Sequence, residues 1–277
     1  MQNQLIINDT ITALVKELLL ENSRNEAISK ILAIQDQIPN LATILWYSSA
    51  TVTALLDDLV SNYQILGKII SRSNSQKIIN LLQIFNILAK DDNTKIPFIR
   101  SNLPIYIFPY IQLSEKQETW HIAAAALVVF TSLVSDSNPE IIKYLLNADF
   151  IPIVRKTFGY NNIKIQTASA YIIAKILCDT DGISSILANS EGVSLLLTIF
   201  TNTFIELSNN FNSGLSEYVV LALSLMLPNQ EVQKKFTYIA YKQLESISLS
   251  KVDARYRELY NQMKALVATH SKNLALS

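Results

Sequence analysis

The chain has 277 residues, is 49% apolar, and carries 23 basic and 23 acidic residues, so its net charge is zero and no basic excess points to nucleic acid. Its 5 glycines leave little for sharp turns or for a loop that cradles phosphate, so we expect an all-helical chain. Its single cysteine excludes an internal disulfide framework and most zinc sites.

The amino terminus, MQNQLIINDT, lacks the basic flank and the long apolar core of a signal peptide. We therefore expect a cytoplasmic protein, with the nucleus left open as a second location.

Residues 37–56, QIPNLATILWYSSATVTALL, form an uncharged run that is long enough to cross a bilayer. Its hydroxyl side chains and its acidic flanks argue against a membrane span. The run instead predicts two short helices that divide near Ser48 and Ser49, with serine supplying the N-cap oxygen. The side chains expected to face the core are Leu41, Leu45, Val52, Leu55 and Leu56.

Four apolar segments downstream resemble one another, and each ends in leucine before a polar break. The aligned leucines are Leu88, Leu133, Leu177 and Leu225, spaced by 45, 44 and 48 residues. That spacing matches armadillo or HEAT repeats of about 40–47 residues. It predicts an all-α, right-handed superhelical solenoid of about six repeats, forming one domain over residues 1–277 with order from about residue 10 to 269.

A second landmark, a polar turn followed by an apolar helix, recurs between these segments. Its prolines are expected in the first turn of a helix, where a missing N–H is tolerated; they are Pro39, Pro104 and Pro152. Residues 203–216 predict a polar loop or a frayed helix end. Residues 252–267 predict a capping helix with one buried face, made of Tyr256, Leu259, Tyr260, Met263, Leu266 and Val267.

The residue types that carry catalysis are sparse. His121 and His270 are the only histidines, so no histidine-rich metal site is expected, and His121 is interpreted as a packing or capping residue. Cys178, which ends an apolar helix, is interpreted as a small buried residue. No nucleotide-binding or nucleophile-elbow motif occurs. We expect neither an enzyme nor a cofactor.

The alternating aromatics Tyr106, Phe108 and Tyr110 leave two interpretations open. Core packing is favoured, and a peptide cleft beside a kink at Pro109 is the alternative.

Several stretches resemble one known family at corresponding intervals. They are residues 25–63 (NEAISKILAIQDQIPNLATILWYSSATVTALLDDLVSNY), 103–111 (LPIYIFPYI), 141–153 (IIKYLLNADFIPI) and 174–182 (AKILCDTDG). They resemble the "required for cell differentiation" (Rcd/Caf-type) family, the armadillo-repeat subunit of the CCR–NOT mRNA deadenylase. The resemblance covers residues 20–200 well and the last quarter poorly.

This resemblance implies an adaptor that docks on the large scaffold subunit of the complex and captures short peptides of translational regulators. The implied scaffold-binding residues are Tyr47, Ser49, Thr53 and Val60, and the implied peptide-pocket residues are Pro152, Ser190 and Gly192. Ser190 and Gly192 depart from the tyrosine and arginine that members with tryptophan pockets carry there. No arginine occurs from Tyr218 to Gln233, where the family tends to be arginine-rich, so nucleic acid is not expected as a partner.

No membrane partner is expected, and a homodimer is left open. Two alternative functions remain: an armadillo-like adaptor in another pathway, such as trafficking or the cytoskeleton, and a nucleic-acid-binding module. A deadenylase pull-down separates the first alternative from the favoured function. Binding that weakens steeply with salt would mark the second.

Overall fold

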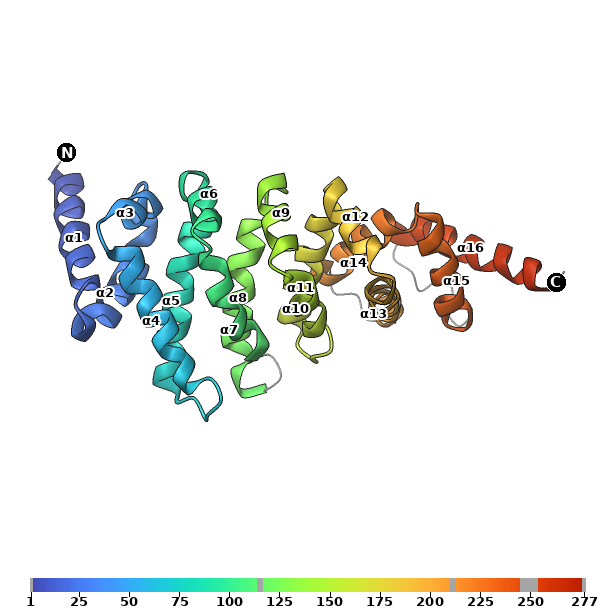
Figure 1. Cartoon of the computed structure of the whole chain (residues 1–277), viewed down its shortest axis with the longest axis horizontal. Coiled ribbons are helices and arrows are strands. Elements are labelled where there is room, and N and C mark those ends of the chain that lie inside the picture. The colour runs from blue at the N-terminus through green and yellow to red at the C-terminus, as the bar shows by residue number, and fades with distance from the viewer. Residues whose placement is uncertain (1, 114–116, 210–212, 245–253, 276–277) are drawn as a thin grey trace. The chain divides into compact units, whose positions relative to one another are not determined.

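The structure is a computed structural model that describes residues 2–113, 117–209, 213–244 and 254–275. Every regular element in these ranges is an α-helix or a short 3-10 helix. The chain divides into two compact units, Met1–Asp136 and Ser137–Ser277, and within each unit the helices follow one another in chain order (Figure 1). A single domain over the whole chain stays a prediction.

The first unit consists of eight α-helices and four 3-10 helices in its described residues. Their bounds are α1 Gln2–Leu18, α2 Glu21–Ile34, η1 Gln35–Gln37, α3 Leu41–Tyr47, α4 Thr51–Ser61, η2 Asn62–Ile65, α5 Arg72–Lys90, α6 Asp92–Arg100, η3 Leu103–Ile107, α7 Phe108–Gln112, η5 Gln117–Thr119 and α8 Trp120–Leu133. Helix α5 packs along α8, and α2 and α3 also pack on α5. The core of this unit therefore lies around α5.

The second unit is built in the same way. The bounds of its described helices are α9 Pro139–Asn147, α10 Phe150–Thr157, α11 Ile163–Leu177, α12 Thr180–Ala188, α13 Ser190–Asn209, α14 Ser213–Met226, α15 Gln230–Leu244, η7 Ala254–Tyr256 and α16 Arg257–Ala275. Helix α11 packs along α14, α10 packs on α11, and α15 packs between α13 and α16.

The repeated leucines mark core positions in three of the four segments. Leu88, Leu133 and Leu177 are fully buried at the ends of α5, α8 and α11. In the fourth segment Leu225 is only half-buried, and its neighbour Met226 is fully buried. The alignment of the fourth segment on Leu225 is therefore displaced by one residue from the buried position.

The uncharged run 37–56 forms two short helices, α3 and α4, as predicted. Leu41, Leu45 and Leu55 are buried, whereas Val52 and Leu56 are only half-buried. The predicted serine N-cap is wrong: Ser48 donates its hydroxyl hydrogen bond back to the carbonyl of Ile44 and thereby closes α3. Helix α4 starts after Ala50, which adopts a left-handed backbone with φ of 61°.

The polar turn of the second landmark has a common backbone feature. Asn40, Asn102 and Asp149 precede α3, η3 and α10 with φ of 58°, 58° and 52°, a conformation that Asn and Asp tolerate better than most residues. Pro104 and Pro152 fall in the first turn of the following helix, as predicted. Pro39 instead lies two residues before α3.

Several predictions in the weaker regions need correction. Cys178 is exposed, because it lies past the last residue of α11. His121 is also exposed rather than packed. Residues 203–216 were predicted to be a polar loop or a frayed helix end. The loop is wrong for residues 203–209, which belong to α13, and for 213–216, which belong to α14, and residues 210–212 lie outside the described part.

The capping helix is present as α16, although residues 252 and 253 of its predicted start lie outside the described residues. Of its predicted buried face, all side chains except the half-buried Leu266 are buried: Tyr256, Leu259, Tyr260, Met263 and Val267.

Within the described residues, no single helix has both the length and the apolar composition needed to cross a membrane. One pair of helices, Thr180–Ala188 and Glu191–Phe204, meets those criteria only when taken together, and the two are bent by 105°.

Candidate functional site

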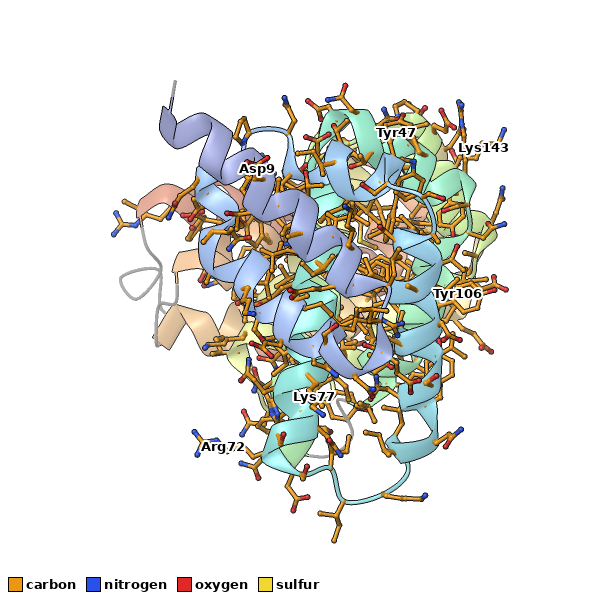
Figure 2. All side chains as sticks on the ribbon, turned by 90° about the vertical axis from the view of Figure 1, so that its left-hand side faces the viewer. Asp9, Tyr47, Arg72, Lys77, Tyr106 and Lys143 are labelled. Carbon is orange, nitrogen blue, oxygen red and sulfur yellow. The ribbon has the colours of Figure 1, made fainter. Side chains whose placement is uncertain are left out.

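Two surfaces contain residues that the sequence singled out, one in each unit. The first is formed by Tyr47, Ser49, Thr53 and Val60, and is called the docking face below. All four side chains are exposed, Tyr47 to 68% and Val60 to 38%. Figure 2 labels Tyr47 in the upper part of the view.

The end of α3 explains why Tyr47 points outward. Leu45 is fully buried, and the ring of Trp46 meets the buried ring of Phe98 edge-on, with centroids 6.4 Å apart. Because successive residues on a helix point about 100° apart, these two anchors leave the next side chain, Tyr47, facing solvent.

Helix α4 extends the docking face along one stripe. Thr53, Asp57 and Val60 stand at positions i, i+4 and i+7 and are exposed, so they lie within about 60° of one another around the helix. The fully buried Leu55 and Leu59 occupy the opposite side. The structure thus adds Asp57 to the middle of the exposed stripe.

Two tyrosine hydroxyls tie the end of α4 and the turn after it to α7 and η3. The hydroxyl of Tyr110, fully buried in α7, donates a hydrogen bond to the backbone carbonyl of Leu59 at 2.6 Å. The hydroxyl of Tyr63 donates to the carbonyl of Tyr106. Burial raises the pKa of Tyr110 and raises that of Tyr63 to about 12, so both hydroxyls stay protonated donors at neutral pH. Of the alternating aromatics, Tyr110 is core, as favoured, and Tyr106 is exposed.

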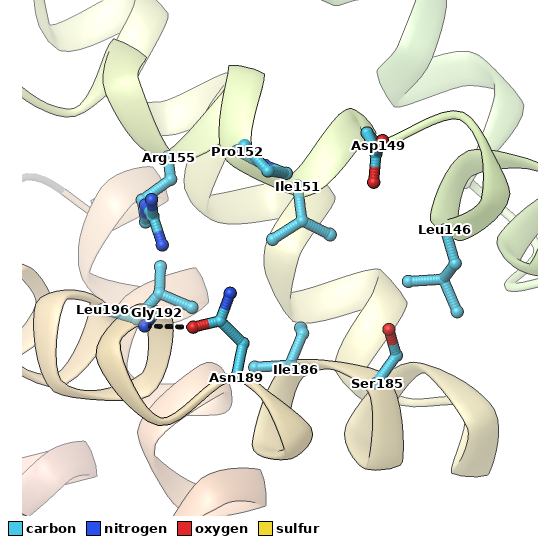
Figure 3. A pocket seen from close by; sticks show the side chains of 10 residues that line it. All are labelled: Leu146, Asp149, Ile151, Pro152, Arg155, Ser185, Ile186, Asn189, Gly192 and Leu196. Carbon is cyan, nitrogen blue, oxygen red and sulfur yellow. Dashed lines mark hydrogen bonds between the residues drawn. The ribbon is translucent and has the colours of Figure 1, made fainter.

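The second surface is a pocket of about 130 Å³ in the second unit (Figure 3). Helices α9, α10, α12 and α13 and the turns before α10 and α13 supply its lining, which consists of Leu146, Asp149, Ile151, Pro152, Arg155, Ser185, Ile186, Asn189, Gly192 and Leu196. Apolar cavities of about 150 Å³ hold one six-membered aromatic ring. The pocket is therefore of the size that receives a single apolar side chain.

Helix packing and one capping side chain define the walls of this pocket. Helix α9 packs on α12, and α12 packs on α13. A buried hydrogen bond between the hydroxyls of Thr157 and Ser169 fixes α10 against α11. Asn189 does not adopt the left-handed backbone of the earlier turns; its side-chain Oδ1 accepts a hydrogen bond from the backbone N–H of Gly192 at 2.8 Å.

The structure brings Pro152 and Gly192 together in the pocket, 40 positions apart in sequence. Ser190 begins α13, and its side chain lies outside the described residues. Sequence reasoning missed Arg155 and Asp149, the two charged residues of the lining. A signal for Arg155 existed, since it follows Pro152 by three positions on one helix and so shares its face.

Among the described residues, no group of three or more His, Cys, Asp or Glu side chains could hold a metal ion. The chemistry that both surfaces offer is contact: exposed aromatic and apolar groups on the docking face, and a small pocket lined by both apolar and polar residues, with charged residues at its ends.

Comparison with known proteins extends these observations. The family model described as "Cell differentiation family, Rcd1-like" matches residues 14–269. Cell differentiation protein rcd1 of Schizosaccharomyces pombe is 24% identical over 246 residues, which cover 87% of either chain. Protein CAF40 of Saccharomyces cerevisiae is 26% identical over 170 residues, 61% of this chain and 46% of that protein.

Solved structures of armadillo repeat proteins align with most of the chain. A designed armadillo repeat protein in complex with the peptide (KR)4 aligns with a TM-score of 0.61 and is 15% identical in sequence. A second designed armadillo repeat protein aligns with a TM-score of 0.62 and is 14% identical. Each alignment covers 92% of this chain and 98% of the designed protein. The predicted all-α armadillo-like solenoid is confirmed, and the family match over residues 14–269 shows that the chain belongs to the Rcd1-like cell differentiation family.

Proposed function

We propose that this protein is a non-enzymatic adaptor subunit of the CCR–NOT mRNA deadenylase complex. It docks on the large scaffold subunit of the complex through the docking face and captures peptides of regulatory proteins in the pocket of the second unit. Its place of action is the cytoplasm, where repression and decay of mRNA would follow from recruitment. The observation that carries the proposal is the family match over residues 14–269.

The docking face supports the first half of the proposal through its composition. Tyr47 supplies an exposed aromatic ring, the kind of side chain that dominates binding energy at protein interfaces. Ser49 and Thr53 are small and uncharged, so a helix of the scaffold can approach α4 closely. A long side chain at Thr53, in the exposed stripe of α4, would hold such a helix away.

The pocket supports the second half. Its apolar wall contains Ile151, Ile186 and Leu196, and its volume suits one inserted side chain such as an aromatic ring. The designed armadillo repeat protein in complex with the peptide (KR)4 supports the proposal that a protein with this fold binds a peptide. Affinity in such complexes rests on a few anchoring side chains.

Docking is tested by the substitution Thr53→Tyr. We expect the variant to lose co-purification with the deadenylase scaffold while its helicity and melting temperature stay close to those of the wild type, because residue 53 is exposed. The matched control is Thr180→Tyr, the same change at an exposed position of α12 in the second unit, which should bind the scaffold normally. Unchanged scaffold binding by Thr53→Tyr would refute the docking face.

A further inference from the structure

The pocket of the second unit is electrically asymmetric. Of its ten lining residues only two are charged, Asp149 and Arg155. Figure 3 shows them at opposite ends of the pocket, with Ile151 and Pro152 of the same helix between them. A ligand that enters the pocket therefore meets a carboxylate at one end and a guanidinium at the other.

The guanidinium of Arg155 is available to a ligand. Within the described part of the chain, its side chain makes no hydrogen bond and no ion pair, although the residue is half-buried. An arginine offers five N–H donors in a planar fork, and a half-buried one without a partner gains most from an anion that it can bind bidentately.

Gly192 keeps this guanidinium at the pocket. A Cβ atom added at residue 192 would stand 2.9 Å from Nη1 of Arg155 and 3.1 Å from Oδ1 of Asn189. A larger residue at this position would therefore push the guanidinium aside or disturb the cap of α13. Gly192 thus leaves room for the guanidinium that comes from α10.

A second source of positive potential lies on the same side. Asn189 and Gly192 belong to the N-terminal end of α13, a helix of 20 residues. The N-terminus of a helix carries a partial positive charge that favours an anion within the first turn. The N–H of Gly192 is already bonded to Asn189, and the first turn of α13 also carries Glu191, so Arg155 is the main positive group at this end. Asp149 repels an anion at the opposite end.

From this arrangement we infer that the pocket receives an apolar side chain of a partner peptide whose flanking residue carries a carboxylate, and that this carboxylate pairs with Arg155. The inference rests on the proposed function, since it specifies the peptide that the pocket captures. The opposed charges of Arg155 and Asp149 fix the direction in which the peptide lies.

The test uses the purified 277-residue chain and three peptides blocked at both ends: GSDDWDDSG, GSNNWNNSG and GSKKWKKSG. They place acidic, neutral or basic residues on both sides of one tryptophan, so the orientation of binding need not be known. Calorimetric titration at low salt should give about tenfold tighter binding of the acidic peptide than of the neutral one. The reason is that one hydrogen bond between the carboxylate and the guanidinium changes the affinity by about that factor. The basic peptide should bind most weakly.

Two pairs of variants separate the charge preference from the pocket itself. Arg155→Gln should abolish the difference between the acidic and neutral peptides, whereas Lys156→Gln, the same charge change at the exposed neighbouring residue, should keep it. Ser185→Trp places a bulky ring at the exposed rim of the pocket and should weaken all three peptides. Ser184→Trp, on the same helix but outside the lining, should weaken none.

Each outcome has one meaning. Equal affinities for the acidic and neutral peptides, both weakened by Ser185→Trp, would overturn the charge preference and leave peptide capture in place. A preference for the acidic peptide that survives in Arg155→Gln would overturn the role of that residue. Failure of all three peptides to bind the wild type would overturn both the inference and the capture half of the proposed function.

Discussion

Gly182 lies so close to Ile176 that a Cβ atom added to the glycine would stand 2.0 Å from the carbonyl oxygen of the isoleucine. Gly182 is in the first turn of α12, and Ile176 is near the end of α11, so this approach lets the chain fold back sharply between the two helices. The backbone carbonyl cannot rotate away as a flexible side chain would.

Gly182→Ala is therefore expected to destabilise the protein by about 1–3 kcal/mol or more, the range of overpacked interior sites. Chemical denaturation measures the change in the free energy of unfolding. Gly67→Ala is the matched control, because a Cβ at Gly67 meets nothing within 4 Å, and it should leave stability nearly unchanged. Equal stability of the two variants would show that the contact at Gly182 relaxes without cost.

Tyr110→Phe should destabilise the first unit by about 1–3 kcal/mol, because it leaves the buried carbonyl of Leu59 without its hydrogen-bond donor. Thermal unfolding with far-ultraviolet circular dichroism measures the effect. Tyr238→Phe removes a hydroxyl from a side chain that is 85% exposed and should change the melting temperature little. A Tyr110→Phe variant as stable as the wild type would mean that water replaces the lost donor.

Asp58→Asn should stabilise the protein at neutral pH and not below about pH 4. Burial raises the pKa of Asp58 in the folded state, while Arg24 and Lys77 oppose the shift. Since the folded pKa lies above the unfolded one, the folded state resists ionisation, and stability falls as the pH rises through that interval. The asparagine does not ionise and avoids this loss.

Unfolding free energies of the wild type and of Asp58→Asn, measured from pH 3 to pH 7, test this prediction. The two curves should meet at the acidic end and diverge as the pH rises. Asp57→Asn, at the exposed neighbouring residue, should follow the wild type within about 0.5 kcal/mol. Curves for Asp58→Asn and the wild type that run parallel would contradict the assignment of the penalty to burial of this carboxyl.

The repeat architecture was predictable because core helices carry a strong local signal. Three of the four aligned leucines are buried, and the break between α3 and α4 falls where the serine pair indicated. Features that depend on backbone geometry were harder to predict. Ala50 precedes α4 in a left-handed backbone conformation, which alanine rarely adopts, so its residue type did not indicate it. Cys178 lies one residue beyond its helix, and that difference changes it from buried to exposed.

The candidate sites were predictable to a different extent. The residues of the docking face were named from the family resemblance. The exposure of Thr53 and Val60, and that of Asp57 between them, could also have been predicted from the period of α4. The pocket combines residues from four helices, and of its lining only Pro152 and Gly192 were named beforehand, through the family resemblance. The approach of Arg155 to Gly192 depends on tertiary packing, which no local pattern contains.

The central claim, membership in the deadenylase complex, is tested most directly by affinity purification of the tagged full-length protein from its own cells, with mass spectrometry of the bound proteins. The proposed function predicts that the large scaffold subunit and the deadenylase subunits are enriched together with the wild type and with Thr180→Tyr, and are lost with Thr53→Tyr. Enrichment of trafficking or cytoskeletal proteins with the wild type, without the scaffold subunit, would contradict it.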